Sequence, residues 1–194
     1  MKTSARLLIC LSLSLLLPAA AWAETYRVDV IVFLNKGGTD GELGRSTTSI
    51  DMRRAIEITD TAGLGAAGIT LLPDSAFGLT SEWDHLRYAK NFKPLLRLAW
   101  IQKDPPAADG PALHLRWGEG FVGNGASLSP VDGTLSLTAD HYLHLNADLV
   151  YTEATGNGYT SYRLHEDRLM RRDEIHHLDS PKLGILARVV KAGS

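Results

Sequence analysis

The chain has 194 residues with one cysteine, and its formal net charge at pH 7 is −2. The first 23 residues hold two of the 20 Lys and Arg residues and none of the 22 Asp and Glu residues, so the remainder carries −4. A mildly acidic balance argues against a nucleic-acid or anionic-membrane partner that is recruited by bulk charge. The cysteine is Cys10, so residues 24–194 are expected to contain neither disulfides nor thiolate chemistry. These 171 residues, 194 minus 23, are enough to bury an ordinary hydrophobic core.

The start of the chain has the pattern of a secretory signal peptide. Lys2 and Arg6 give a positively charged beginning, and the apolar run "LLICLSLSLLL" follows from Leu7 to Leu17. "AWA" then supplies small residues at the positions that a signal peptidase recognises, which predicts cleavage between Ala23 and Glu24. The apolar run is too short to span a bilayer comfortably. We therefore expect an exported protein without stable membrane insertion, with residues 24–194 as a single domain.

The first half of this domain has strand and helix patterns. "TYRVDVIVF", residues 25–33, alternates with β-branched residues throughout and predicts a strand. The sequence indicates no clear structure for residues 35–80. Ser81 is expected to cap a helix that Pro94 ends. "LLRLAWIQ", residues 95–102, then has apolar residues on both faces, which is typical of a central strand.

The second half has the pattern of an antiparallel meander. "ALHLRW" predicts a strand, and residues 132–151 predict two strands around a turn at Ala139 and Asp140. In the second of these, Leu143, Leu145, Ala147 and Leu149 are expected to be buried, with Tyr142, His144, Asn146 and Asp148 on the polar face. "TGNG" has the composition of a hairpin turn, and "KLGILARVVK" predicts a last apolar strand. The predicted fold class is α+β: a mostly antiparallel β-sheet with one or two helices packed on it.

The stretch "RRDEIHHLDSPKLG", residues 171–184, has the composition of a metal or catalytic site but not the spacing. Neighbouring histidines on a strand, such as His176 and His177, point to opposite faces, and zinc needs three or four converging ligands. We also find no cysteine nucleophile and no Gly-x-Ser-x-Gly motif in residues 24–194. We expect no metal, no cofactor and no catalytic residues. The alternatives are a hydrolase or amidase that uses His176 and Asp179, and a hydrogen-bond network that locks the turn to the sheet.

Sugar binding requires fewer precisely placed groups than catalysis does, because aromatic faces and fixed polar groups suffice to hold a glycan. Aromatic residues occur on or beside the predicted strands, where the pattern of each favours a place in the core or at a sheet edge over a ligand contact. These residues are Trp100, Trp117, Tyr142 and Tyr162.

Four blocks of the chain resemble, in the same order, the CsiV family of periplasmic, peptidoglycan-binding cell-shape proteins of Gram-negative bacteria. They are the signal peptide with "YRVDVIVF", the strand "LLRLAWIQ", the segment "VDGTLSLTADHYLHLNADLVY", and "YRLHEDRLMRRDEIHHLDSPKLGILARV". Together they span about half of residues 24–194, and we expect them to share one sheet.

The last block departs from the family pattern in places. Arg168, Met170, Glu174, His176, Asp179, Pro181 and Gly184 match it, whereas Leu169 replaces an arginine, His177 a tyrosine and Ser180 a histidine. A metal site built on the family's His-Asp-His set would lack one ligand here. The chain is also shorter than the family pattern between the first strand and the helix.

The resemblance implies a periplasmic accessory factor in wall assembly. It implies that the protein binds peptidoglycan and supports a class A penicillin-binding protein through that enzyme's outer-membrane lipoprotein activator. A pure protein–protein adaptor is the other non-enzymatic alternative. The candidate ligand-binding residues supply aromatic stacking, hydroxyl pairing and, from the arginine, a partner for a stem-peptide carboxylate. They are Trp100, Gln102, Tyr142, His144, Arg168, Glu174, His176 and Asp179.

Overall fold

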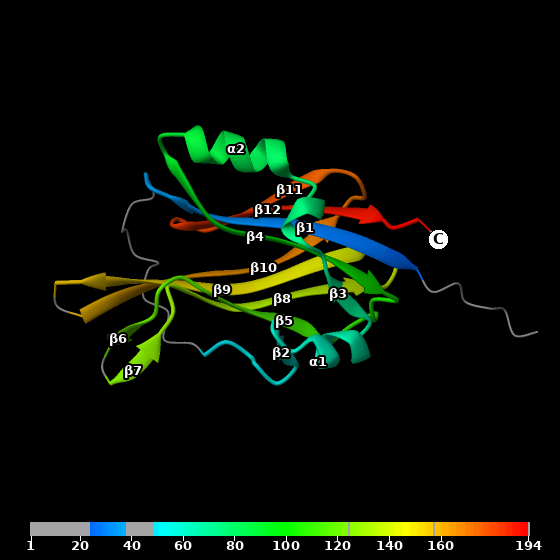
Figure 1. Cartoon of the computed structure of the whole chain (residues 1–194), viewed down its shortest axis with the longest axis horizontal. Helices are drawn as coiled ribbons and strands as arrows, with labels where there is room; N and C mark the ends of the chain where they lie inside the picture. The colour runs from blue at the N-terminus through cyan, green and yellow to red at the C-terminus, as the bar shows by residue number, and fades with distance from the viewer. Residues whose placement is uncertain (1–23, 38–48, 124, 157, 194) are drawn as a thin grey trace, which may run out of the picture.

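A computed structural model of the chain describes residues 24–37, 49–123, 125–156 and 158–193. The predicted signal peptide and its cleavage site at Ala23 lie outside these residues, apart from Glu24. Most of the strands form two five-stranded sheets, which lie face to face as two layers (Figure 1). The described helices pack around these layers, so the predicted α+β class with mostly antiparallel strands is confirmed.

Sheet A has the strand order β11-β12-β1-β4-β3. Its strands are antiparallel, and they are β1 (Thr25–Asn35), β3 (Ile69–Leu71), β4 (Phe92–Lys103), β11 (Ile175–Asp179) and β12 (Leu183–Lys191). Sheet B has the order β10-β9-β8-β5-β2. It contains β2 (Ala55–Glu57), β5 (Ala112–Trp117), β8 (Val131–Ala139), β9 (Leu143–Thr155) and β10 (Gly158–Met170), with only the β2–β5 pair parallel.

The remaining elements connect or cover the sheets. Helix α1 (Thr61–Ala66) lies between β2 and β3, and so links the edges of the two sheets. The 3-10 helix η1 (Asp74–Ala76) and helix α2 (Thr80–Tyr88) lie against sheet A on the side away from sheet B (Figure 1). Strands β6 (Phe121–Gly123) and β7 (Ala126–Leu128) form a small separate hairpin.

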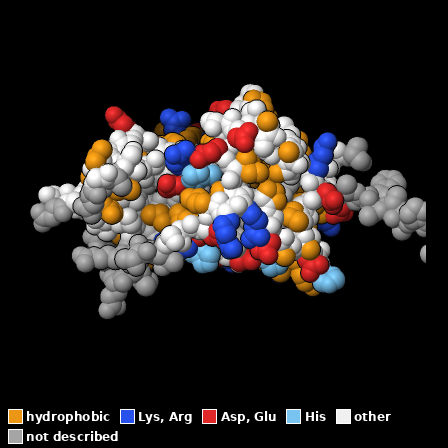
Figure 2. All heavy atoms as spheres, turned by 90° about the horizontal axis from the view of Figure 1, so that it is seen from below, with side chains coloured by type: hydrophobic (Ala, Val, Ile, Leu, Met, Phe, Trp, Pro, Cys, Tyr) orange, Lys and Arg blue, Asp and Glu red, His pale blue; other side chains and the backbone are white. Residues whose placement is uncertain are grey.

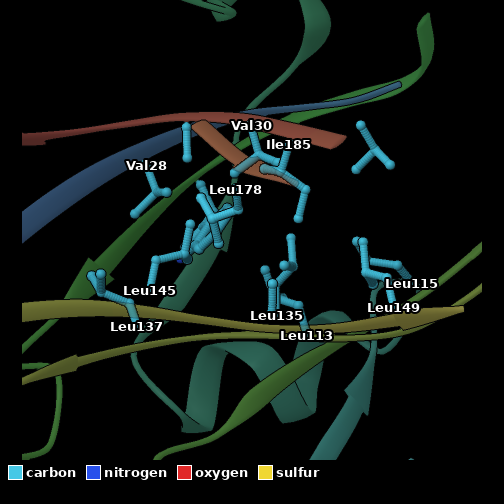
Figure 3. Packing of buried hydrophobic residues seen from close by; sticks show 14 of the residues in the cluster. Val28, Val30, Leu113, Leu115, Leu135, Leu137, Leu145, Leu149, Leu178 and Ile185 are labelled. Atoms are coloured by element: carbon cyan, nitrogen blue, oxygen red, sulfur yellow. The ribbon is translucent and has the colours of Figure 1, made fainter. Parts of the chain in front are cut away.

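An apolar core fills the space between the two sheets. Side chains from β1, β11 and β12 point toward those of β5, β8 and β9, as Figure 3 shows. The alternation predicted for β9 is confirmed, because the four residues expected to be buried are at most 7% exposed. Sheet A has a second apolar face, where Ile31, Phe33 and Ala99 pack against Leu79 and Leu86 at and within α2. Sheet B has no comparable cover in the described part of the chain, and its outer face carries polar side chains.

The four blocks that resemble the family do not share one sheet, contrary to our expectation. The first two blocks form β1 and β4 in sheet A, and the third forms β8 and β9 in sheet B. The last block runs from β10 in sheet B into β11 and β12 in sheet A. A strand that is apolar on both faces needs cover on both sides, whereas a strand with one polar face needs cover on one side only. The two kinds of strand therefore lie in different layers.

Two details of the predicted helix are also wrong. Leu79 occupies the N-cap position without a side-chain cap bond, and Ser81 lies inside α2. The helix ends at Tyr88, well before Pro94, which lies within β4. Pro94 pairs with Phe33 next to a register shift in the β1–β4 ladder, and such irregularities tolerate a missing N–H donor.

A buried ion-pair network fixes the approach to α2 on sheet A. Asp29 on β1 is 0% exposed; it accepts hydrogen bonds from Arg27 at 2.8 and 3.0 Å and from the Gly78 N–H at 2.7 Å. Arg188 on β12 donates to the Gly78 carbonyl at 2.9 Å. A Cβ atom at Gly78 would lie 2.6 Å from Arg188 Nη2 and 2.8 Å from Asp29 Oδ2. The close approach of these three charged groups therefore requires glycine at this position.

We predict that Gly78→Ala lowers the free energy of unfolding by about 2 kcal/mol, because the added methyl group forces the buried ion pairs apart. Gly65→Ala in α1 is the matched control, since a Cβ atom there meets nothing within 4 Å. Urea unfolding measures both variants. Equal midpoints for the two variants would show that the Asp29 network does not constrain this segment.

Candidate functional site

The outer face of sheet B is built from rows of polar side chains that cross its strands. The register places Thr134 of β8 opposite Asp148 of β9, and Asp148 opposite His165 of β10. The next row joins Ser136, Asn146 and Asp167 in the same way. Because the neighbouring positions on each strand point into the core, these polar residues all face outward.

A groove with a volume of about 510 Å³ runs over this face. Its floor is the polar rows, and its sides come from the segments 51–54 and 107–110. Arg54 and Asp109 join the two segments through an ion pair of 2.7 Å. Seen from the side of sheet B, histidine, basic and acidic side chains mingle near the middle of this face (Figure 2).

Histidines on this face are paired with carboxylates. His144 Nδ1 lies 2.7 Å from Asp167 Oδ1, and His165 Nδ1 lies 3.5 Å from Asp148 Oδ2. His114 on β5 lies outside the groove lining and contacts two carboxylates, Glu57 at 2.8 Å and Asp132 at 2.7 Å. These pairs hold the imidazole rings in fixed orientations.

Two ion pairs stabilise the charges around the groove. Arg163 donates two hydrogen bonds to the buried carboxylate of Asp148, at 2.6 and 2.7 Å, and this bonding raises the pKa of Arg163. Partial burial raises the pKa of Glu57, but His114 and Arg116 outweigh that effect, and the net pKa is lowered. The Glu57 carboxylate therefore remains ionised at neutral pH and accepts hydrogen bonds.

The groove offers hydroxyl, amide, imidazole and carboxylate groups to a ligand. Such groups pair well with the hydroxyl and acetamido groups of a glycan, each of which both donates and accepts hydrogen bonds. Among the described residues, no three His, Cys, Asp or Glu side chains are close enough together to hold a metal ion.

The structure places Trp100 and Gln102 in the core, so neither can stack on or pair with a surface ligand. Trp100 is 0% exposed and Gln102 is 1% exposed. The Trp100 indole N–H donates to Gln102 Oε1 at 3.3 Å, and Gln102 Nε2 donates to the Leu137 carbonyl of β8 at 3.3 Å. The expectation that these two residues bind a ligand is therefore wrong. Both side chains point toward sheet B, where they satisfy each other's polar atoms.

Tyr142 and His144 lie close together at one end of sheet B. His144 lines the groove. Tyr142 is 64% exposed in the turn between β8 and β9, and it lines a second groove at the end of the sandwich. Of the two residues, only His144 lines the groove on sheet B.

The remaining candidates do not converge on one site. Arg168 is paired with Glu166 on the same strand, which leaves less of its charge for a ligand carboxylate. Glu174 lies 4.0 Å from Arg171 in the turn after β10. Asp179 is at the opposite end of β11 from this turn.

His176 has a structural contact. Its Nε2 accepts a hydrogen bond of 2.9 Å from the Arg171 N–H, which ties the turn between β10 and β11 to the sheet. This contact is the hydrogen-bond network considered above as an alternative to catalysis. His177 points the other way and stacks on Phe33 with ring centroids 5.7 Å apart. The glycine at position 184 leaves room for the Phe33 ring, because a Cβ atom there would lie 2.4 Å from Phe33 Cζ.

Sequence reasoning missed most of the polar groups in the groove. The alternating pattern of β8 and β10 was the available signal, since it places Thr134, Ser136 and Asp167 on one face once the register is known. The segments 51–54 and 107–110 gave no signal, because nothing in their sequence indicates which strand they flank.

We predict that His176→Ala lowers the free energy of unfolding by about 1 kcal/mol, the usual contribution of one intramolecular hydrogen bond. His141→Ala is the control, because this exposed ring makes no hydrogen bond to any residue that the structure describes. Denaturant unfolding compares the two. No loss of stability in His176→Ala would contradict the structural role of this histidine.

A model of a known protein family matches nearly the whole chain. The family model described as "Peptidoglycan-binding protein, CsiV" matches residues 3–192. No curated protein and no solved structure matches the chain. The match covers both sheets and every described helix, and it agrees with the resemblance of the four blocks. The chain belongs to the CsiV family of peptidoglycan-binding proteins.

Proposed function

We propose that this protein is an exported, non-catalytic peptidoglycan-binding factor of the periplasm, and that the groove on sheet B holds the glycan. The observation that carries the proposal is the groove itself. Its floor is a regular array of hydroxyl, amide and imidazole groups on a face that no other element of the described chain covers. Membership of a peptidoglycan-binding family supports the choice of ligand.

The regular spacing of the polar rows suits an extended ligand. Neighbouring strands are about 4.8 Å apart, and outward side chains along one strand recur about every 6.8 Å. A glycan strand that lies across β8, β9 and β10 therefore meets a hydrogen-bonding group at each strand. Ser136 and Asn146 lie side by side at the centre of this array.

The contacts on the groove face support a protein that binds its ligand without catalysis. On the groove face, His144 pairs with Asp167, and Asp148 pairs with Arg163 and His165. His176 bonds to the backbone of a turn, and Asp179 lies at the far end of the same strand. A hydrolase would need an acid and a base within reach of one scissile bond.

The described part of the chain contains no helix with the length and apolar character of a membrane span.

A supporting role for wall synthesis completes the proposal. The protein would bind peptidoglycan and assist a class A penicillin-binding protein through its outer-membrane lipoprotein activator, and so affect cell shape. This part rests on the family resemblance. It requires that the partner binds away from the groove, so that wall and partner can be held together.

We predict that the protein co-sediments with purified sacculi and that Ser136→Ala/Asn146→Ala weakens this binding about tenfold. The double variant removes two hydrogen-bonding groups from the floor of the groove, and losses of 0.5–1.5 kcal/mol for each add to about that factor. Thr70→Ala/Asn91→Ala is the matched control, since both residues are exposed on the sheet A side of the molecule.

Three other outcomes would count against the proposal. Release of soluble muropeptides that is lost in His176→Ala would show a hydrolase or amidase. Failure to sediment with sacculi, while the lipoprotein activator still co-purifies, would show a pure adaptor. Equal loss of binding in the two double variants would place the glycan elsewhere.

A further inference from the structure

A second groove, of about 770 Å³, lies at the end of the sandwich where the C-terminus of the chain is found (Figure 1). We call it the end groove. Leu143, Leu169 and Met170 give it an apolar part, and the exposed ring of Tyr142 stands beside them. Arg171 and Arg172, from the turn between β10 and β11, complete its lining together with acidic groups.

The two arginines of the end groove are largely uncompensated. Arg171 is 74% exposed, and its nearest carboxylate, Glu174, is 4.0 Å away. Arg172 is also exposed; it lies near enough to Glu24 to help lower the pKa of that carboxyl, but it makes no ion pair with a described carboxylate. Guanidinium groups in this state are available for the paired hydrogen bonds that they make with carboxylates.

The turn that carries the arginines is held in place by two hydrogen bonds. His176 accepts a hydrogen bond from the Arg171 N–H. The Asp173 N–H donates to the Val189 carbonyl of β12 at 2.9 Å, with Asp173 in the left-handed region at φ 68°. A fixed backbone lowers the entropy cost of ordering the arginine side chains on a ligand.

The acidic residues of the end groove differ in how far they are neutralised. Glu24 binds Lys191 at 2.6 Å and accepts a hydrogen bond from the Tyr26 hydroxyl; these contacts, led by Lys191, lower its pKa. Burial and the bond to Glu24 raise the pKa of Tyr26 to about 12, so its hydroxyl remains a donor. Asp104 and Asp140 are exposed and make no ion pair with described residues. The end groove therefore presents acidic side chains, Asp104 and Asp140, as well as the basic side chains of Arg171 and Arg172.

The end groove adjoins the groove on sheet B. Asp140, in the turn between β8 and β9, lines both of them. His144 and Asp167 line the sheet groove. Tyr142 and Leu169, each two residues along the chain from one of them, line the end groove. A branched ligand can therefore occupy both grooves at once.

We infer that the end groove holds the stem peptide of a peptidoglycan strand whose glycan lies on sheet B. The stem peptide carries carboxylates, which Arg171 and Arg172 bind, and an amino group, which fits the free carboxylates of Asp104 and Asp140. Its small apolar side chains fit against Leu169 and Tyr142. The inference rests on the proposed function, and it transfers to Arg171 and Arg172 the role expected of Arg168, which is engaged by Glu166.

The test compares two ligands and three proteins by calorimetric titration. One ligand is uncrosslinked glycan strands that carry stem peptides, and the other is the same strands stripped of peptides by an amidase. The proteins are the unmodified chain, Arg171→Gln/Arg172→Gln, and Arg87→Gln/Lys90→Gln. The last of these removes the same charge from exposed positions in and after α2.

The unmodified chain should bind peptide-bearing strands about tenfold more tightly than stripped strands, as expected for charge-assisted bonds to carboxylates. Arg171→Gln/Arg172→Gln should bring its affinity for peptide-bearing strands down to that for stripped strands and leave the latter unchanged. Arg87→Gln/Lys90→Gln should behave like the unmodified chain.

Equal affinity of the unmodified chain for the two ligands would overturn the inference and leave glycan binding intact. The same holds if the two Arg/Lys double variants lose affinity equally, since bulk charge would then explain the effect. If the unmodified chain binds neither strand, the proposed function itself fails, and the stem-peptide site fails with it.

Discussion

A buried chain of hydrogen bonds joins the two sheets, and the exposed polar face of the protein depends on it. Trp100 of sheet A donates to Gln102, and Gln102 donates across the core to the Leu137 carbonyl of sheet B. An amide and an indole N–H are costly to bury unless each finds a partner. The Trp100 indole finds its partner in Gln102 of the same strand, whereas the Gln102 amide finds its partner in the opposite layer, so this second bond also sets how the layers face each other. Leu137 is on β8, the strand whose next residues outward are Ser136 and Thr138 of the groove.

The same packing explains why the two sheets have different outer faces. Sheet A is apolar on both sides and is closed by α2, which the Asp29 network holds in place through Gly78. The apolar side chains of sheet B pack in the core, and its hydroxyl, amide and imidazole groups lie on the outer face. The pair of layers therefore leaves one broad polar surface in the described structure. The turn after β10 extends that surface around the end of the sandwich with Arg171 and Arg172.

The sequence was informative where a residue's role follows from alternation along a single strand. The buried and polar faces of β9 could be predicted, because each side chain alternates with the next. The strand limits of β1, β4, β5 and β8 were close for the same reason. The division into two sheets could not be predicted, because alternation does not say which strands pair. Trp100 and Gln102 looked like sugar ligands, since an aromatic ring next to an amide has the same composition in a core as in a binding site. His176 was a candidate ligand-binding residue, and the sequence could not separate that role from a structural one, because its partner is a backbone N–H five residues earlier.

Amide chemical-shift mapping during titration with soluble, peptide-bearing glycan strands tests the central claim most directly. If the outer face of sheet B holds the glycan, the largest changes fall on β8, β9 and β10 around Ser136, Asn146 and Asp167, and they extend to Arg171 and Arg172. Changes confined to α2 and the outer face of sheet A would contradict the account, because they would place the ligand on the opposite side of the molecule.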